Sequence, residues 1–183
     1  MTFAELNPPY STIVADPPWA YDEGWPRFGD RAGVAHDRTP LPYSSMTVAE
    51  IAALPVAEIT SPDAHVYIWT TNRYLDDAFD VLRAWGFRYS TTLVWAKTPV
   101  GVGPGGAYAI TTEFVLHGRR GSLKALQRVE TSWWNWPKGS HSAKPAAFLD
   151  TVERVSPGPY VELFCRRPRF GWDSWGKGYE GAA

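Results

Sequence analysis

The chain has 183 residues, of which 44% are hydrophobic, and its 18 Lys and Arg against 19 Asp and Glu give a formal net charge of −1. This is the composition of an ordinary soluble globular domain, and the length suits one core rather than two. No apolar stretch approaches the length of a membrane span and the N-terminus carries no apolar signal region, so we expect neither membrane insertion nor export.

The N-terminal part of the chain predicts a strand and a helix that are separated by a long loop. A β-rich run over residues 11–15 predicts the strand, and the polar, Gly- and Pro-rich segment 24–42 predicts a mobile loop. Thr47 followed three residues later by Glu50 forms a capping box, which predicts a helix that runs through Leu54.

The middle of the chain predicts a strand, a helix and a second strand. The run 65–70 has the composition of a buried strand. From Leu75 to Trp85, apolar residues recur at the spacing of one helical face, and Gly86 suits the C-terminal end of that helix. The residues that follow, 87–97, predict the next strand.

The remaining chain continues this alternation. A glycine-rich loop over 99–106 precedes two further predicted strands at 112–117 and 129–136. An amphipathic helix over 148–155 is stopped by a Ser-Pro-Gly sequence, and 160–165 is the last predicted strand. Strands that alternate with helices predict an α/β fold with a mostly parallel sheet, helices on both faces and a single domain over residues 1–183.

The tetrapeptide Asp16-Pro17-Pro18-Trp19 directly follows the first predicted strand, where ligands bind in open α/β sheets. Its groups suit the exocyclic amine of adenine, because the Asp16 carboxylate and the Pro17 carbonyl can accept its two hydrogens and favour a more tetrahedral nitrogen. Trp19 offers a flat face to the ring, and such stacking contributes about 1–3 kcal/mol. The structural alternative is an Asp-Pro-Pro turn with Trp19 in the core.

Seven motifs occur along nearly the whole chain, at residues 16–19, 41–46, 67–70, 93–97, 112–115, 141–145 and 160–166. In these motifs and in their order, the sequence resembles the N6-adenosine methyltransferases of the seventy-kilodalton MT-A type. That family includes the catalytic subunit of the eukaryotic messenger-RNA writer and small bacterial and phage relatives. The resemblance implies a Rossmann-like, circularly permuted methyltransferase fold that uses S-adenosylmethionine, with the catalytic motif ahead of the cofactor strand.

Matched position by position, the resemblance also implies roles for individual residues. The residues implied to hold the target adenine are Asp16, Pro17, Pro18 and Trp19. The walls or lids of the adenine pocket are implied to be Tyr43, Trp69 and Trp95. The residues implied to bind the cofactor are Asp16, Lys144, Glu162 and Arg166. One departure is that Trp175-Gly176-Lys177-Gly178 stands where relatives often carry Gly-Asn-Gln, whose amides contact the cofactor ribose.

Several other signals favour structural interpretations. Residues 101–106 match G-x-G-x-x-G, but Pro104 and the following residues do not open a helix, so we interpret them as a flexible loop. The four histidines show no metal-ligand spacing, and no metal site is expected. Cys165 lies in an apolar run as an inert core residue, and being the only cysteine it excludes an internal disulfide and favours a reducing, cytoplasmic setting.

The nature of the substrate is less sharply defined. Residues 1–116 carry seven Lys and Arg against thirteen Asp and Glu, whereas residues 117–183 carry eleven against six. A basic half suits a phosphate-facing surface, so nucleic acid containing adenine is the expected partner, with DNA slightly favoured over RNA. A small adenine nucleoside or nucleotide as substrate, and a non-catalytic nucleic-acid-binding subunit, remain as alternatives. The oligomeric state is open, with a homodimer or heterodimer among the alternatives.

Overall fold

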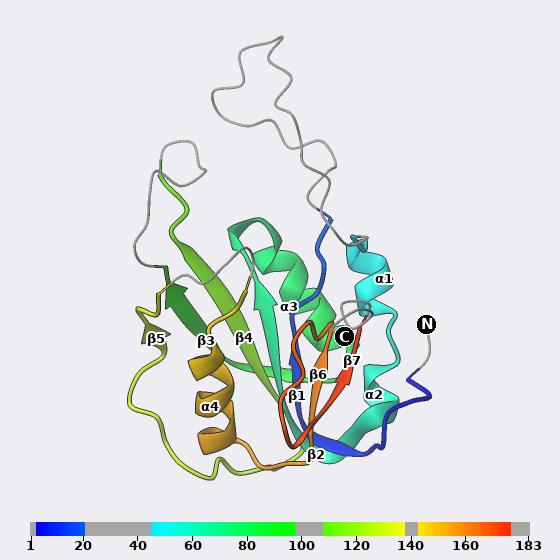
Figure 1. Cartoon of the computed structure of the whole chain (residues 1–183). Helices are drawn as coiled ribbons and strands as arrows, with labels where there is room; N and C mark the ends of the chain where they lie inside the picture. Colours follow the sequence, from blue (N-terminus) through cyan, green and yellow to red (C-terminus); the bar gives the residue numbers. More distant parts are fainter. Residues whose placement is uncertain (1–2, 21–44, 98–107, 138–142, 177–183) are drawn as a thin grey trace.

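The computed structural model describes residues 3–20, 45–97, 108–137 and 143–176, and they build a single layered α/β arrangement (Figure 1). Seven strands form one sheet in the order β5-β3-β4-β2-β1-β6-β7. The strands are β1 Tyr10–Ala15, β2 Thr60–Thr70, β3 Arg88–Ala96, β4 Thr112–Arg120, β5 Trp133–Trp134, β6 Tyr160–Leu163 and β7 Trp172–Trp175. The helices are α1 Val48–Ala52, α2 Val56–Ile59, the 3₁₀ turn η1 Asn72–Tyr74, α3 Leu75–Ala84 and α4 Ala146–Val155.

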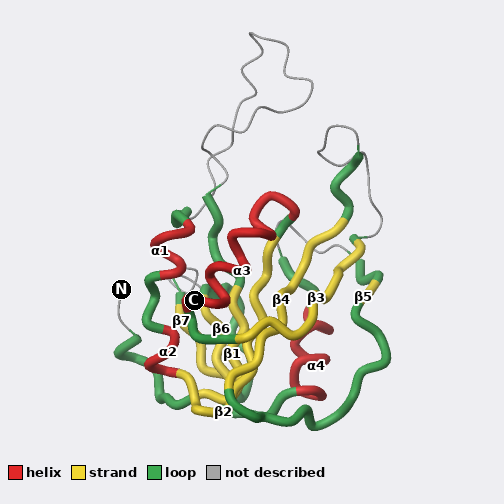
Figure 2. Tube along the Cα trace, turned by 180° about the vertical axis from the view of Figure 1, so that it is seen from behind, coloured by secondary structure: helices red, strands yellow, loops and turns green. Residues whose placement is uncertain are grey.

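The sheet is mostly parallel, as the alternation of strands and helices predicts. β1 pairs in parallel with β2 and with β6, β6 pairs in parallel with β7, and β3 pairs in parallel with β5. β4 is antiparallel to both of its neighbours, β2 and β3, and so it is the one reversed strand of the described sheet. The helices α1, α2 and α3 cover one face and α4 covers the other (Figure 2).

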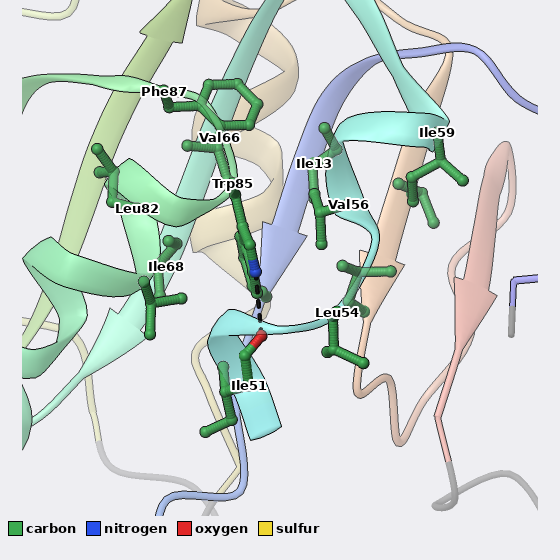
Figure 3. Packing of buried hydrophobic residues seen from close by; sticks show 14 of the residues in the cluster. Ile13, Ile51, Leu54, Val56, Ile59, Val66, Ile68, Leu82, Trp85 and Phe87 are labelled. Atoms are coloured by element: carbon green, nitrogen blue, oxygen red, sulfur yellow. Dashed lines mark hydrogen bonds between the residues drawn. The ribbon is translucent and has the colours of Figure 1, made fainter. Parts of the chain in front are cut away.

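The face under α1, α2 and α3 holds the larger core cluster. Trp85, just beyond α3, is fully buried, and its indole Nε1 donates a hydrogen bond of 3.1 Å to the carbonyl of Ile51 (Figure 3). Gly86 then adopts a φ of +83°, and the two hydrogen bonds of a Schellman motif end the helix there, as the sequence predicts. The predicted capping box of Thr47 and Glu50 is also present at the start of α1.

A second core cluster lies between the sheet and α4. Phe148 and Val152 from α4 pack against the opposite sheet face, where Trp69 and Trp95 are also buried. Phe148 and Trp69 meet edge to face, with ring centroids 4.7 Å apart. This packing fixes the position of α4 and, with it, of the residues that lead into its first turn.

The structure corrects one sequence prediction and adds one strand that the sequence did not predict. Only Trp133–Trp134 of the predicted strand 129–136 is extended and paired, because this edge segment has a single neighbour and the hydroxyl of Thr131 bonds locally to Trp133. β7 was not predicted, because its four residues alternate Trp with polar Asp173 and Ser174 rather than forming an apolar run. The predicted loops 24–42 and 99–106 lie outside the described residues. None of the described helices combines the length and apolarity needed to cross a membrane.

Candidate active site

The end of β1 lies where the chain connections of the sheet diverge. β1 sits between β2 and β6, and from it the chain proceeds to β2 on one side, whereas β6 proceeds to β7 on the other. Open α/β sheets bind ligands in the crevice that such a switch point creates. Asp16 follows β1 directly, and its backbone N–H lies 3.4 Å from the carbonyl of Leu163, which ends β6. The fold therefore places Asp16 at this switch point, where such sheets bind ligands.

The backbone of the motif folds into a tight turn. The Pro17 carbonyl accepts a hydrogen bond of 2.9 Å from the Trp19 N–H, and the Pro18 carbonyl accepts one of 2.8 Å from the Met46 N–H. Both carbonyls lie outside the strands, and each accepts a hydrogen bond from a backbone N–H. Because a carbonyl oxygen has two lone pairs, Pro17 keeps one for a further donor.

Trp19 lies inside the molecule rather than at its surface. Its side chain is 3% exposed, its Nε1 donates to the Trp69 carbonyl at 3.1 Å, and its ring stacks on Tyr74 with centroids 5.2 Å apart. This is the arrangement that the structural alternative describes. Contact between Trp19 and an adenine ring stays a prediction, and it would require a change in the Tyr74 contact or an approach at the ring edge.

Four charged side chains form a row at the end of the sheet where β1 and β3 end, and we call them the charged row. Lys144 Nζ lies 3.0 Å from Asp16 Oδ1 and 3.3 Å from Glu113 Oε2, and Lys97 Nζ lies 2.5 Å from Glu113 Oε1. The four side chains are between 14% and 23% exposed. They come from four separate elements: the end of β1, the start of β4, the end of β3 and the residues before α4. Such partly buried pairs are screened far less by solvent than surface pairs.

Within the charged row, the direction of each pKa shift follows from burial and from the neighbouring groups of opposite charge. Burial acts to lower the pKa of Lys144, but the carboxylates of Asp16 and Glu113 outweigh it and raise that pKa above its ordinary value. Burial acts to raise the pKa of Glu113, but the ammonium groups of Lys144 and Lys97 outweigh it and lower that pKa. Lys144 and Glu113 are therefore both charged at neutral pH.

Each of the two lysines in the charged row lies over a buried tryptophan. Lys144 Nζ is 5.3 Å from the ring centroid of Trp69, and Lys97 Nζ is 5.4 Å from that of Trp95. The two rings are 2% and 3% exposed, and they meet edge to face at 6.0 Å. Cation–π attraction thus holds both ammonium groups at the sheet edge. Both rings lie beneath the lysines, so the contact of Trp69 and Trp95 with adenine stays a prediction.

The second carboxylate of the crevice is Glu162 on β6. It lies in register with Val14 of β1, and its Oε2 accepts a hydrogen bond of 3.3 Å from the Cys165 thiol. Burial, together with the negative charge of Asp16, raises the pKa of Glu162 in spite of the opposing effect of that hydrogen bond. Cys165 is 2% exposed, and burial raises the pKa of its thiol to about 12, so it stays protonated and unreactive.

The structure thus brings together some of the sequence-predicted residues. Asp16 contacts Lys144 directly and interacts electrostatically with Glu162, and Arg166 is exposed shortly after β6. The predicted pocket residue Tyr43 lies outside the described residues, as do Lys177 and Gly178. In the described part of the chain, no group of three or more His, Cys, Asp or Glu side chains is arranged to hold a metal ion.

Sequence reasoning assigned no role to Glu113 and Lys97, although both lie in the recognised motifs. A signal was available, because each is a charged residue near one end of a predicted strand and next to apolar residues of that strand. What the sequence could not supply is the antiparallel pairing of β3 with β4, which sets Glu113 opposite Trp95 and next to Lys97.

The comparison with known proteins agrees with this geometry. The profile of the MT-A70 family matches residues 10–178. The chain belongs to the MT-A70 family. By this membership the chain is an adenine N6-methyltransferase. The membership also accounts for the α/β methyltransferase fold, in which β1, the strand before the motif, precedes β6, the strand that carries Glu162, and pairs with it.

The relatives of this MT-A70 protein differ greatly in length. It is 30% identical to the type II methyltransferase M.MunI of a Mycoplasma species, over 91% of this chain and 76% of that protein. It is 25% identical to the human N(6)-adenosine-methyltransferase catalytic subunit METTL3, over 86% of this chain and 26% of METTL3. A putative MT-A70-like N(6)-adenosine-methyltransferase of Medicago truncatula is 26% identical, and the chain spans 27% of its length. The chain thus covers most of the bacterial relative and about a quarter of the eukaryotic ones.

Proposed function

We propose that this chain transfers a methyl group from S-adenosylmethionine to the N6 amine of adenine in nucleic acid, with DNA as the favoured substrate. The observation that carries the proposal is the position of Asp16, which stands at the switch-point crevice with Oδ1 held 3.0 Å from Lys144 Nζ. A carboxylate fixed in this way has its other oxygen available for an amine hydrogen.

The side chains around the crevice suit the proposed cofactor. Lys144 provides an ammonium group for a carboxylate, and Glu162 provides a buried acceptor for vicinal ribose hydroxyls. In the described part of the chain, Glu162 accepts a hydrogen bond only from a thiol, which is a weak donor, so it has acceptor capacity to spare. S-adenosylmethionine would supply an electrophilic methyl group on a sulfonium here.

The chemistry then requires alignment more than a strong base. The Asp16 carboxylate accepts one hydrogen of the amine, and the remaining lone pair of the Pro17 carbonyl accepts the other. The nitrogen would take the methyl group as the carbon–sulfur bond breaks to leave a neutral thioether, and it would then lose one proton to solvent. Holding the reacting atoms in line accounts for a large part of the rate enhancement of such displacements.

DNA is favoured over RNA because the chain covers M.MunI far more fully than it covers the eukaryotic relatives named above. M.MunI, named a type II methyltransferase, matches over most of its length, whereas the adenosine methyltransferases of eukaryotes match over about a quarter of theirs. A free adenine nucleoside is the second candidate, favoured by the net charge of −1, which provides no strong general attraction for phosphate.

Methyl transfer to matched substrates tests the proposal. Isotope-labelled S-adenosylmethionine is incubated with the full chain and with adenine-containing DNA, RNA of the same sequence, or adenosine, and the products are digested to locate the methyl group. We expect N6-methyladenine with DNA as the best substrate. Label on RNA or adenosine alone would replace DNA with that substrate, and label on another atom would overturn the proposed chemistry.

A further inference from the structure

We propose that Glu113 is a positioning residue for methyl transfer, acting by fixing the Lys144 ammonium against Asp16. This inference rests on the proposed role of Asp16 as the acceptor for the amine. The observation behind it is that Glu113 bridges two lysines, with Oε2 3.3 Å from Lys144 Nζ and Oε1 2.5 Å from Lys97 Nζ.

The reversed direction of β4 brings Glu113 to the site. Because β4 runs against its neighbours, its first residues lie at the edge where β1, β2 and β3 end. Glu113 is in register with Trp95, so both side chains point to the sheet face that α4 covers. The Glu113 side chain is 14% exposed, which is the lowest value in the charged row, and the sheet rather than a loop sets its position.

The charges explain why such a bridge is needed. Three groups lie against the Lys144 ammonium: the carboxylate of Asp16 just after β1, the carboxylate of Glu113 from β4, and the Trp69 ring from β2. Lys97, just after β3, lies on the other side of Glu113. With Glu113 present, two ammonium groups alternate with two carboxylates. Without its charge, the two lysines would repel each other with no carboxylate between them, and among the described residues Lys144 would keep only Asp16 as an ion-pair partner.

The consequence for the reaction is a loss of alignment at Asp16. Lys144 holds Oδ1 of Asp16, and this leaves the direction of Oδ2 set for the incoming amine. If Lys144 moves, Asp16 turns with it, and displacements of about 1 Å cost on the order of 100-fold in rate. Such a loss should appear in kcat rather than in KM, since the interaction matters in the transition state.

Three variants of the full chain separate this role from a general structural one. Glu113→Gln removes the charge and keeps the size, Glu113→Asp keeps the charge on a shorter side chain, and Glu153→Gln is the matched control. Glu153 is also an ion-paired carboxylate, 2.8 Å from Arg169, but its other partner is the indole of Trp172 on β7, and among the described residues it has no ion pair with Lys97 or Lys144. We expect Glu113→Gln to lower kcat by about 10- to 100-fold with KM changed less than about threefold. Glu113→Asp should retain part of the rate, and Glu153→Gln should stay within about twofold.

The pH dependence supplies a readout that a purely structural role would not move. The negative charge of Glu113 raises the pKa of Lys144, so the neutral glutamine lowers it. The alkaline limb of the kcat profile should therefore move to lower pH in Glu113→Gln and stay in place in Glu153→Gln. An unchanged kcat with an unchanged alkaline limb would overturn the inference, as would equal losses in both variants.

Titration of Lys144 by NMR, with its signal assigned from Lys144→Arg, tests the inference without any substrate. If the wild-type chain methylates none of the substrates offered, the proposed function fails, while the titration still reports on the bridge. We then expect a lower Lys144 pKa in Glu113→Gln than in the wild type, and an equal pKa would overturn the bridging role. Active wild-type protein with an unaffected Glu113→Gln variant would instead leave the proposed function standing and remove this inference.

Discussion

Lys144 Nζ lies 3.0 Å from Asp16 Oδ1, so the residue that follows β1 and the residue that leads into α4 meet at one edge of the sheet. This contact joins the sheet to the α4 layer at the proposed reaction centre. It also means that neither residue acts alone, because removing one partner leaves the other partly buried charge with fewer compensating contacts.

Replacement of Asp16 by alanine should abolish methyl transfer, with a loss of about 100-fold or more, because one acceptor for the amine hydrogens is removed. Cofactor affinity should fall much less, since Lys144 and Glu162 remain. Kinetics and calorimetric titration with S-adenosylmethionine measure the two effects separately. Asp80→Ala is the control, because Asp80 pairs with Arg83 on the exposed side of α3. Retained activity in Asp16→Ala would contradict the assigned role.

Glu162→Gln should weaken S-adenosylmethionine binding by about 10-fold or more, because a charged acceptor for hydroxyl groups gives the stronger hydrogen bonds.

The same change should raise the melting temperature of the ligand-free chain at neutral pH. The sign follows from the raised pKa of Glu162: the folded state favours its protonated form, so that stabilisation is lost as the pH rises through the folded pKa. Glutamine resembles the protonated form at every pH. A melting temperature that falls at neutral pH would contradict this prediction.

Cofactor affinity of the wild-type chain should fall on mild acidification, at pH values above the ordinary Glu pKa of about 4.3. The carboxylate of Glu162 takes up a proton as the pH drops through its raised pKa, and it then accepts hydroxyl hydrogen bonds less well. Calorimetric titrations across the acidic range measure this effect. In Glu162→Gln the acidic loss should be absent, and its persistence there would assign the effect to another group.

Trp85→Ala should lower the free energy of unfolding by about 3–5 kcal/mol, the usual cost of truncating a fully buried large aromatic side chain. It also removes the indole donor and leaves the Ile51 carbonyl without that partner. Urea unfolding measures the change. Trp133→Ala is the matched control, because the Trp133 side chain is 60% exposed and its loss should change stability by less than about 1 kcal/mol.

Methylation of DNA oligonucleotides should decline steeply with added salt, whereas turnover of free adenosine should not. Phosphate contacts release counterions, and each contact adds nearly one unit to the logarithmic salt slope. Activity assays between about 50 and 200 mM salt give the slope. A flat response together with good turnover of adenosine would favour the small-molecule candidate over nucleic acid.

Much of the fold could be predicted because its signals are local. The capping box at Thr47, the helical spacing up to Trp85 and the apolar run that forms β2 each depend on residues close in sequence, and the structure confirms them. The predicted strand 129–136 was wrong over most of its length because edge pairing, which the sequence does not encode locally, decides where an aromatic run is extended.

The site was less accessible from sequence than the fold. The sequence allowed Asp16 to be placed at a strand end and its motif to be matched to a family. It did not allow the ion-pair partners of Lys144 to be predicted. The bridge through Glu113 depends on the register between β3 and β4, and the burial of Trp19 depends on Tyr74 from a separate segment. Both are long-range relationships that a single sequence does not reveal.

Trp69 contributes to this site through two chemically independent parts. Its carbonyl anchors the Trp19 indole, and its ring lies beneath Lys144. The carbonyl belongs to the backbone and is present whatever side chain stands at that position. Mutation at position 69 would therefore change both the surroundings of the lysine and the packing against Phe148, whereas the backbone anchor of the turn that follows Asp16 does not depend on the side chain at that position.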